Sequence, residues 1–352
     1  MKTINFGIIG TGLMAATMME AFKQVASVNV MAVASESAER ATSFAARFNI
    51  AKAYGSVDDL LTDAAVDAVY IVNLTESHAA TTIKALQAGK AVLCEKPIAT
   101  SEADCLRIQE AATKTGKLCM EAMWTHFLPA YQRLFQLNAT QGLGNPTQLY
   151  ADFGYPTNKE AYPRLFKPSA GSGVLLDRGV YPIALAIKLF GNVKQINAQV
   201  TRNQDGVDTE AYLILSHENG CKSQLSTSIQ SLQQNRAVLS FTEGAASLEP
   251  PVIGAEALIV QSVQPHQATY QSSLGLKAKI KQMLKQSALL RKLKSKKSLG
   301  KRHFYSYGQN QYVPVLNHFC GLVQHNKLES DVIPLSFSSE VLRVVDQVKA
   351  AV

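Results

Sequence analysis

The stretch that decides the fold is Ile4-Asn5-Phe6-Gly7-Ile8-Ile9-Gly10-Thr11-Gly12-Leu13-Met14-Ala15. An apolar run, a glycine turn and a helix-prone segment follow one another, and in that context the pattern G-x-G-x-x-[GA] predicts dinucleotide binding. Gly10 permits the tight turn, Gly12 lets the main chain approach a pyrophosphate, and Ala15 keeps the helix close to the strand. The free N–H groups and positive dipole end of that helix would hold the phosphates.

The first 120 or so residues alternate between apolar runs and helix-like segments. The expected strands are 4–9, 28–34, 66–72, 91–94 and 118–122, and the expected helices include 38–48 and 79–88. Another helix begins at the capping pattern Ser101-x-x-Asp104. Near-continuous apolar strands between helices predict a parallel sheet covered on both faces, as in an α/β Rossmann domain.

The pattern changes after about Gly144, where several runs alternate with period two and are separated by turn residues. The expected strands are 147–153, 193–200, 211–215, 222–229, 237–241 and 257–263. One helix, 174–190, interrupts them, and a C-terminal helix covers 336–351. This predicts an α+β domain with a largely antiparallel, open-faced sheet.

We therefore expect three regions along the chain. Residues 1–122 form the dinucleotide-binding domain, and residues 123–335 form the substrate and dimerisation domain, with an insertion at about 265–312. Residues 336–352 form a helix that packs back on the body.

Composition narrows the class of protein. With 352 residues, 47% of them hydrophobic, the chain can bury two moderate cores. No apolar run approaches the roughly 20 residues that span a bilayer, and the immediate first strand leaves no room for a signal peptide. The scattered cysteines favour a reducing cytoplasm, and neither they nor the dispersed histidines have metal-site spacing. These cysteines are Cys94, Cys105, Cys119, Cys221 and Cys320. No metal is expected.

The net charge of +8 comes from one segment. Eleven basic and no acidic residues lie in 277–302, and without them the rest of the chain carries −3. Ile280, Met283 and Leu284 recur at helical spacing, which suggests an amphipathic stretch here. The segment could be a solvated excursion, could make weak contact with an anionic surface, or could steer an acidic substrate. Specific nucleic-acid recognition is not indicated, because no motif accompanies the charge.

Three side chains suggest proton-transfer chemistry. Lys96, in Glu95-Lys96-Pro97, follows an expected buried strand at the sheet edge where ligands bind. Asp177 and Tyr181 are four residues apart on an expected helix and so share a face. A lysine, a carboxylate and a phenol near a nicotinamide would form a workable catalytic set.

Four motifs resemble those of the Gfo/Idh/MocA oxidoreductase family, in the branch of trans-dihydrodiol and D-xylose dehydrogenases. They are the glycine turn, Ala91–Pro97, Met120-Glu121-Ala122-Met123-Trp124-Thr125-His126-Phe127-Leu128-Pro129-Ala130, and Gly171-Ser172-Gly173-Val174-Leu175-Leu176-Asp177-Arg178-Gly179-Val180-Tyr181-Pro182. Many relatives carry histidine where this branch carries Tyr181. The resemblance covers nearly the whole chain except about 265–312.

The resemblance implies a homodimer that uses NAD or NADP and moves hydride to or from a sugar, polyol or vicinal diol. Lys96 and Tyr181 take the catalytic roles, with Asp177 orienting Lys96 or the substrate. The expected cofactor contacts are Gly10, Thr11, Gly12, Leu13, Met14, Ser35, Glu36, Arg40, Asn73, Leu74, Thr75, His78, Glu95, Lys96, Trp124 and Arg164. The expected substrate contacts are Trp124, His126, Phe127, Phe153, Arg164 and Tyr181.

The mechanistic hypothesis is that Tyr181 removes the hydroxyl proton as hydride leaves, and that Lys96 and the positive nicotinamide both favour the phenolate. Ser35 and Arg40 would suit a 2′-phosphate whereas Glu36 would repel it, so NAD is slightly favoured over NADP. Two other functions remain open. One is a non-catalytic NAD(P)-binding sensor, and the other is an enzyme with a closed redox cycle on a sugar.

Overall fold

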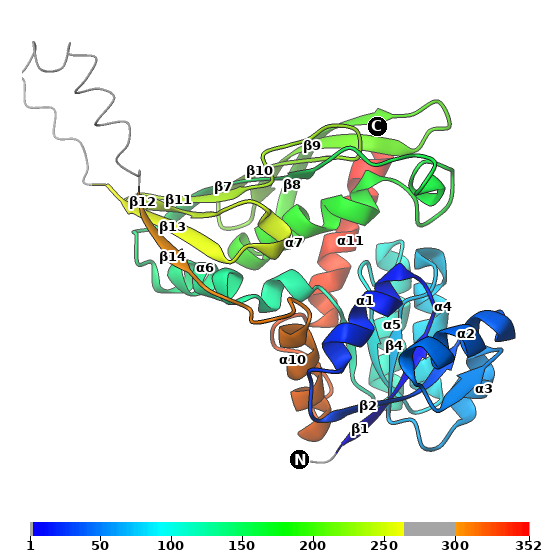
Figure 1. The fold of residues 1–352 in the computed structure, drawn as a ribbon. Helices are drawn as coiled ribbons and strands as arrows, with labels where there is room; N and C mark the ends of the chain where they lie inside the picture. Colours follow the sequence, from blue (N-terminus) through cyan, green and yellow to red (C-terminus); the bar gives the residue numbers. More distant parts are fainter. Residues whose placement is uncertain (1–2, 264–299, 352) are drawn as a thin grey trace, which may run out of the picture.

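A computed structural model describes residues 3–263 and 300–351, which form two domains, each built on one sheet (Figure 1). The first sheet has six parallel strands in the order β3-β2-β1-β4-β5-β6. They are β1 (Ile4–Ile9), β2 (Val28–Ala34), β3 (Lys52–Tyr54), β4 (Ala68–Ile71), β5 (Ala91–Cys94) and β6 (Cys119–Glu121). This arrangement confirms the Rossmann prediction.

Helices cover both faces of this sheet. They are α1 (Leu13–Phe22), α2 (Ala38–Phe48), α3 (Val57–Thr62), α4 (His78–Gln87) and α5 (Glu102–Thr115). Serine side chains cap the first turns of α2, α3 and α5 by accepting main-chain hydrogen bonds. In α5 the acceptor is Ser101 and the donor is the Asp104 N–H, as the capping pattern predicts.

The second sheet has eight strands in the order β14-β13-β12-β11-β7-β10-β9-β8, and only the β7–β10 pair is parallel. They are β7 (Pro146–Gly154), β8 (Val193–Arg202), β9 (Asp208–His217), β10 (Lys222–Ser228), β11 (Ala237–Phe241), β12 (Gly244–Leu248), β13 (Ala257–Ser262) and β14 (Lys301–Phe304). Helices α6 (Pro129–Thr140), α7 (Val180–Phe190) and α11 (Leu335–Ala350) pack on one face, and the other face is open (Figure 1). The largely antiparallel, open-faced sheet is therefore confirmed.

Several elements were not predicted from the sequence. Strands β3, β12 and β14 are short, and β14 (Lys-Arg-His-Phe) is mostly polar, so none has a clear strand pattern. Between β7 and β14 the described residues contain one α-helix, α7, as predicted, whereas α6, before β7, and α10 (Val313–Gln324), after β14, were not predicted. The helix predicted over 174–190 is split, and its first turn (Leu175–Gly179) has π-helical geometry.

The last part of the chain returns to the first domain. Helix α10 packs on α1, and the Phe319 ring lies 5.8 Å from that of Phe6 in the buried core. Helix α11 packs on both α5 and α7 and so spans the two domains. Its Ser338 hydroxyl donates a 2.6 Å hydrogen bond to the buried carboxylate of Glu121 at the end of β6. The same carboxylate accepts the Ile98 N–H at 3.0 Å, which fixes the loop after β5.

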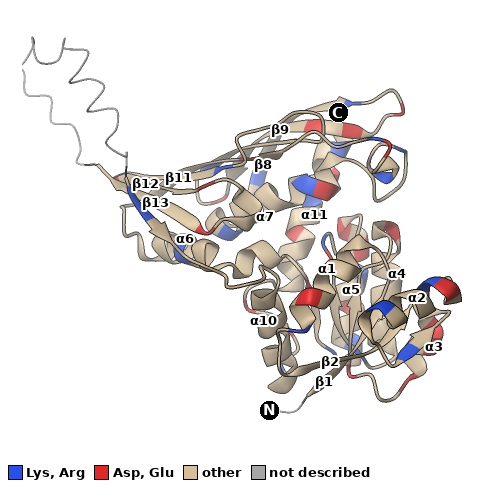
Figure 2. Ribbon diagram, in the orientation of Figure 1, with Lys and Arg blue, Asp and Glu red and all other residues tan. Residues whose placement is uncertain are grey.

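Most of the predicted basic segment lies outside the described residues. Its last two members, Lys301 and Arg302, are in β14, where the Arg302 Nε lies 2.6 Å from a Glu249 carboxylate oxygen. Elsewhere basic and acidic side chains are interspersed, for example on α2, which carries Glu39, Arg40 and Arg47 (Figure 2). Among the residues that the structure describes, no helix combines the length and the apolar character needed to cross a membrane.

Candidate active site

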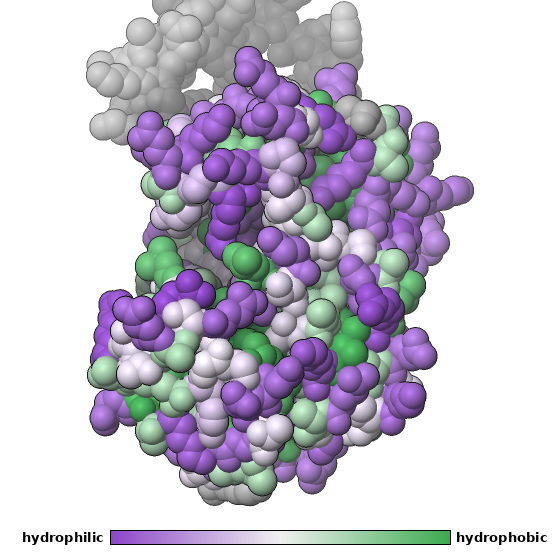
Figure 3. Space-filling view, turned by 90° about the vertical axis from the view of Figure 1, so that its right-hand side faces the viewer, coloured by the Kyte–Doolittle hydropathy of each residue, from purple (hydrophilic) through white to green (hydrophobic). Residues whose placement is uncertain are grey.

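A groove runs along the carboxyl edge of the parallel sheet and faces the second domain. It consists of two adjoining cavities of about 460 and 400 Å³, which share Gly12, Asn73, Leu74 and other lining residues. The side view in Figure 3 shows a hollow between the upper and lower domains. The edge is the one at which ligands bind in open α/β sheets.

The glycine turn fits a dinucleotide phosphate. Gly10 has φ +120°, and a Cβ there would lie 2.6 Å from the Val72 carbonyl oxygen, so only glycine suits this turn. A Cβ on Gly12 would instead meet open space, which leaves room for a ligand above the main chain. No side chain caps the N–H groups at the start of α1, so they are free to bind phosphate.

The end of β2 would hold the adenosine ribose. Ser35, Glu36 and Arg40 line the cavity together, and the Arg40 Nε donates to the Ser35 hydroxyl at 3.4 Å. Glu36 is exposed and stands at the same opening. A 2′-phosphate would thus meet one cation and one anion, which leaves both NAD and NADP compatible with this end of the groove.

The loop after β4 supplies the middle of the groove. Asn73 donates from Nδ2 to the Thr81 hydroxyl at 2.9 Å, while its buried Oδ1 has no partner and is available to a ligand. His78 is buried, and its Nδ1 lies 2.8 Å from the Pro97 carbonyl oxygen. Because a carbonyl only accepts, the proton is on Nδ1. This bond ties α4 to the loop that carries Lys96.

Lys96 enters the cavity from the end of β5 and reaches the second domain. Its Nζ donates to the Asp177 main-chain carbonyl at 2.7 Å and lies 3.9 Å from the Asp177 carboxylate. It also lies 4.8 Å from the centre of the Tyr181 ring. The preceding Glu95 is buried and accepts a 2.6 Å hydrogen bond from the Tyr70 hydroxyl. The three residues of the expected catalytic set are therefore neighbours, although two of them are 81 and 85 positions beyond the first.

Contacts with Asp208, outside the groove, fix the start of the helix that carries Asp177 and Tyr181. The buried carboxylate of Asp208 accepts the Leu175 N–H at 2.7 Å, and Gly173, with φ +93°, approaches that carboxylate so closely that a Cβ would clash. The π turn that follows is a feature often found at functional sites.

Tyr181 lies almost fully buried at the inner wall of the cavity, with 9% of its surface exposed. The Trp124 Nε1–H donates to its hydroxyl at 3.2 Å. Burial, reinforced by the nearby Glu95 carboxylate, raises the pKa of the Tyr181 phenol well above its usual range. Desolvation of the phenolate outweighs the hydrogen bond from Trp124, which acts to lower this pKa. The expectation that Lys96 and a bound nicotinamide favour the phenolate stays a prediction.

All sixteen expected cofactor residues line one of the two cavities. Three of the six expected substrate residues do so as well: Trp124, Arg164 and Tyr181. Phe153 lies behind Tyr181, with its ring perpendicular at 5.6 Å, and does not line the groove.

His126 and Phe127 do not line the groove either, and their expected role is corrected. They belong to a 3-10 turn (Trp124–Phe127) in which neighbouring side chains point in different directions, so that Trp124 alone of the three faces the cavity. His126 is fully buried against Phe135 and Phe337, and burial lowers its pKa to about 3. Phe127 packs on His318.

Other lining residues were missed. Tyr312 packs edge-on against Trp124 with ring centres 4.9 Å apart, and Tyr162 and Glu76 form further parts of the wall. Tyr312 follows the insertion in the sequence, where no motif marks it. Tyr162 lies two residues before Arg164, so its place in the cavity wall could have been predicted from that expected contact.

Comparison with known proteins finds relatives of both domains. A family model described as an oxidoreductase family with an NAD-binding Rossmann fold, Gfo/Idh/MocA, matches residues 4–123, and a Gfo/Idh/MocA C-terminal domain model matches residues 131–247. Trans-1,2-dihydrobenzene-1,2-diol dehydrogenase from Sus scrofa is 32% identical over 252 residues, which cover 70% of this chain and 75% of the relative. The Homo sapiens dehydrogenase is also 32% identical over 252 residues, with the same coverage.

Solved structures share the fold. A 3-ketoreductase from Actinomadura kijaniata in complex with NADP and TDP-benzene has a TM-score of 0.81 and 22% identity, with coverage of 99% of this chain and 98% of the other. Aldose-aldose oxidoreductase from Caulobacter crescentus, complexed with glycerol, has a TM-score of 0.81 and 20% identity, with coverage of 99% and 97%. At these identities the likeness concerns the fold alone.

The residues around Glu36 generate a prediction about cofactor preference. Glu36→Gln should tighten NADPH binding by about fivefold without tightening NADH binding, because it removes one like charge near the 2′-phosphate. Trp124 is the single tryptophan of the chain and lines the groove, so quenching of its fluorescence measures both affinities. Glu39→Gln, a neighbouring change outside the groove, is the control. An unchanged ratio of the two affinities in Glu36→Gln would refute this role.

Proposed function

The chain belongs to the Gfo/Idh/MocA family of NAD(P)-binding oxidoreductases, and from this premise we propose that it transfers hydride between the nicotinamide and a hydroxyl-bearing carbon of a sugar, polyol or vicinal diol. The observation that carries the proposal is the meeting of Lys96, Asp177 and Tyr181 in a cavity that continues into the dinucleotide groove. A binding protein without catalysis would not need a buried phenol beside an ammonium group at this place.

The cofactor is held by the residues already described, and when bound it supplies or accepts the hydride. Tyr181 handles the proton: its hydroxyl donates to the substrate oxygen in reduction and accepts from it in oxidation. The Trp124 N–H fixes the position of the phenol oxygen. Lys96 donates one ammonium N–H to the Asp177 main-chain carbonyl, so its other two N–H groups are available for the substrate oxygen.

The electrostatics of Tyr181 favour the reductive direction. A phenol with a raised pKa is fully protonated at neutral pH and is ready to act as an acid. Acting as a base requires the phenolate, which is scarce at neutral pH. We therefore infer that ketone or aldehyde reduction is the faster reaction near pH 7.

The cavity wall indicates the class of substrate. Four aromatic side chains, Trp124, Tyr162, Tyr181 and Tyr312, line it together with polar groups. Apolar ring faces with a few placed polar groups suit a ring-shaped molecule that bears several hydroxyls. The relatives named for a trans-dihydrodiol act on such a compound, and an aldose has the same character.

The first prediction from this mechanism concerns the phenol. Tyr181→Phe should lower kcat by about 10²–10⁴-fold, because it deletes the proton-transfer group and leaves the ring in place. NAD(P)H oxidation would be followed with a panel of aldoses, ketoses and trans-dihydrodiols. Tyr131→Phe removes a buried hydroxyl bonded to the Val252 carbonyl, outside the groove, and should retain nearly full turnover. Wild-type turnover in Tyr181→Phe would contradict the assignment.

A second prediction concerns pH. Tyr181 loses its proton only when the pH rises through its raised pKa, so reduction should be flat from about pH 6 to 9. Oxidation needs the phenolate, whose fraction grows about tenfold per pH unit below that pKa, so log(kcat/KM) should rise with a slope near 1. A flat oxidation profile over the same range would rule out Tyr181 as the group that titrates.

We further propose that the protein is a homodimer formed through the open face of the second sheet. One row of outward side chains crosses all eight strands in register: Asn197, Ile214, Gln224, Tyr150, Val238, Ser247, Ile259 and Arg302. Its only charged member is Arg302, at the sheet edge. A second copy related by a two-fold axis could therefore cover the row without burying an ion in its middle.

The dimer is tested by placing a charge in that row. Ile214→Lys should convert the dimer into a monomer in sedimentation equilibrium at micromolar concentration, because each subunit would then bury an unpaired lysine in the interface. Leu106→Lys is the matched control, since Leu106 on α5 and Ile214 are both 49% exposed. A wild-type monomer at this concentration, or an Ile214→Lys dimer, would exclude this interface.

The cysteines support a cytoplasmic location. All five are free and buried, although the chain has enough of them for two disulfides. We infer a reducing compartment.

A further inference from the structure

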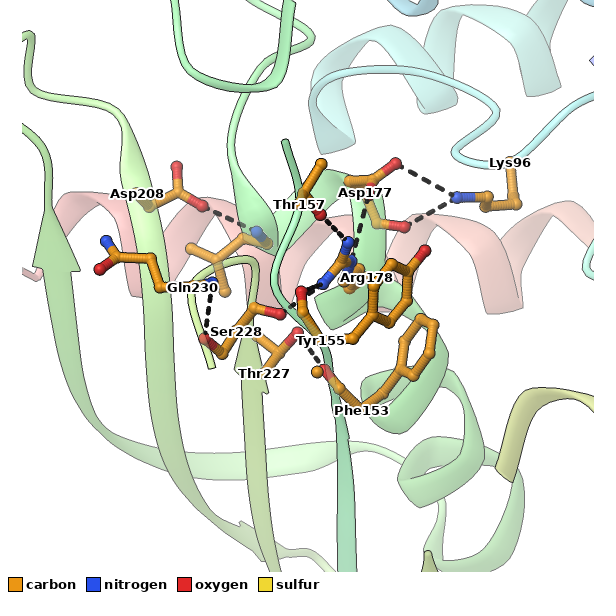
Figure 4. A network of polar contacts seen from close by, with 12 residues as sticks. Lys96, Phe153, Tyr155, Thr157, Asp177, Arg178, Asp208, Thr227, Ser228 and Gln230 are labelled. Atoms are coloured by element: carbon orange, nitrogen blue, oxygen red, sulfur yellow. Dashed lines mark hydrogen bonds and ion pairs between the residues drawn. The ribbon is translucent and has the colours of Figure 1, made fainter. Parts of the chain in front are cut away.

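Arg178, the residue next to Asp177, is buried although it carries a charge. Only 2% of its surface is exposed, and it lies between the first turn of the helix and the second sheet (Figure 4). It does not line the groove. A buried guanidinium is expensive to desolvate, so its contacts call for an explanation.

The guanidinium fastens two strand ends to the helix. Its Nη1 donates to the main-chain carbonyls of Tyr155, at 2.6 Å, and Ser228, at 2.5 Å, and its Nη2 donates to the Thr157 hydroxyl. Its Cζ lies 3.6 Å from the centre of the Tyr155 ring, so the two planes are stacked. Tyr155 and Thr157 open the loop 155–172, which contributes Tyr162, Arg164 and Gly171 to the cavity wall.

The same guanidinium faces the carboxylate of Asp177. The Arg178 Nε lies 3.5 Å from the Asp177 Oδ2, while the Lys96 Nζ lies 3.9 Å from the other oxygen, Oδ1 (Figure 4). The carboxylate is therefore shared between a buried cation and the lysine of the cavity. The Lys96 ammonium is bonded to the Asp177 main-chain carbonyl, and the orientation of the carboxylate adds a second, electrostatic influence on its charge and position.

We propose that Arg178 is a positioning residue for the hydride-transfer reaction. It holds the Asp177 carboxylate, and through it Lys96, in the orientation that leaves ammonium protons for the substrate oxygen. It also fixes the start of the substrate loop at the same point. The inference rests on the proposed function for its kinetic part, and on the structure alone for the coupling of Arg178 to Lys96.

A lysine could not replace the arginine. The planar fork reaches two carbonyls, a hydroxyl and a carboxylate at once and stacks on an aromatic ring, whereas an ammonium group is a compact point charge on a flexible stem. Arg178→Lys keeps the charge and most of the volume, so it isolates the geometry of the fork.

The kinetic test compares two arginine-to-lysine changes. Arg178→Lys should lower kcat by about 10–100-fold, because misplacement of a reacting group by a fraction of an ångström has effects of this order. Its Kd for NAD(P)H should stay within about twofold of wild type. Arg343→Lys disturbs an arginine that binds Glu340 and the Val193 carbonyl on α11, away from the groove, and should keep kcat. An Arg178→Lys protein with wild-type kcat would overturn the kinetic proposal.

A double-mutant cycle separates positioning from general destabilisation. If Arg178 acts through Asp177, the kcat effects of Arg178→Lys and Asp177→Asn should not multiply, and the double variant should be no more than about threefold slower than Asp177→Asn alone. Multiplied effects would show that Arg178 acts by another route and would also overturn the proposal.

A third readout does not depend on turnover. The rate at which formaldehyde and a borane reductant dimethylate Lys96, followed by peptide mass spectrometry, should rise severalfold in Arg178→Lys and not in Arg343→Lys. An unchanged rate would overturn the coupling. If no substrate of the panel is turned over by the wild type, the proposed function fails, and the labelling still decides whether Arg178 positions Lys96.

Discussion

One buried carboxylate, that of Glu121, holds the active-site loop and both domains in a single arrangement. It accepts hydrogen bonds from the Ile98 main chain, two residues after Lys96, and from Ser338 on the helix that spans the domains. Burial raises the pKa of Glu121, so these two donors offset a real desolvation cost. Because Lys96 belongs to one domain and Asp177 and Tyr181 to the other, their meeting depends on this link.

The electrostatics of the cavity follow from the burial of its inner wall. Tyr181 and Glu95 are both buried, and in both cases burial is the main cause of a raised pKa. The phenol is therefore held as an acid, with the Trp124 N–H bonded to its oxygen and the Lys96 ammonium beside its ring. In the proposed reaction both donors would lie close to the substrate oxygen. Preorganised donors in a water-poor site are worth far more than the same groups in water. The arrangement thus suits the stabilisation of an alkoxide.

Much of the fold and part of the site could be predicted from the sequence, for identifiable reasons. The glycine turn and the parallel strands carry strong local patterns, and Lys96, Asp177 and Tyr181 stand in motifs that retain their meaning over a long separation. His126 and Phe127 were misassigned because a motif does not show which side chain of a tight turn faces the cavity. Tyr312 could not be found, since it follows a segment without any motif. The role proposed for Arg178 could not be predicted from the sequence, because it depends on the main-chain carbonyls of Tyr155 and Ser228. Only the folded chain brings these carbonyls to the guanidinium.

The packing of α10 and α11 on the first domain affects the order in which the chain folds during synthesis. Phe319 fills the core beside Phe6, and α11 packs on α5, so the first domain is completed by residues that are made long after its own last strand, β6. Until those residues are made, the part of the first domain that α10 and α11 cover stays exposed. Completion of the first domain therefore waits for synthesis of the second.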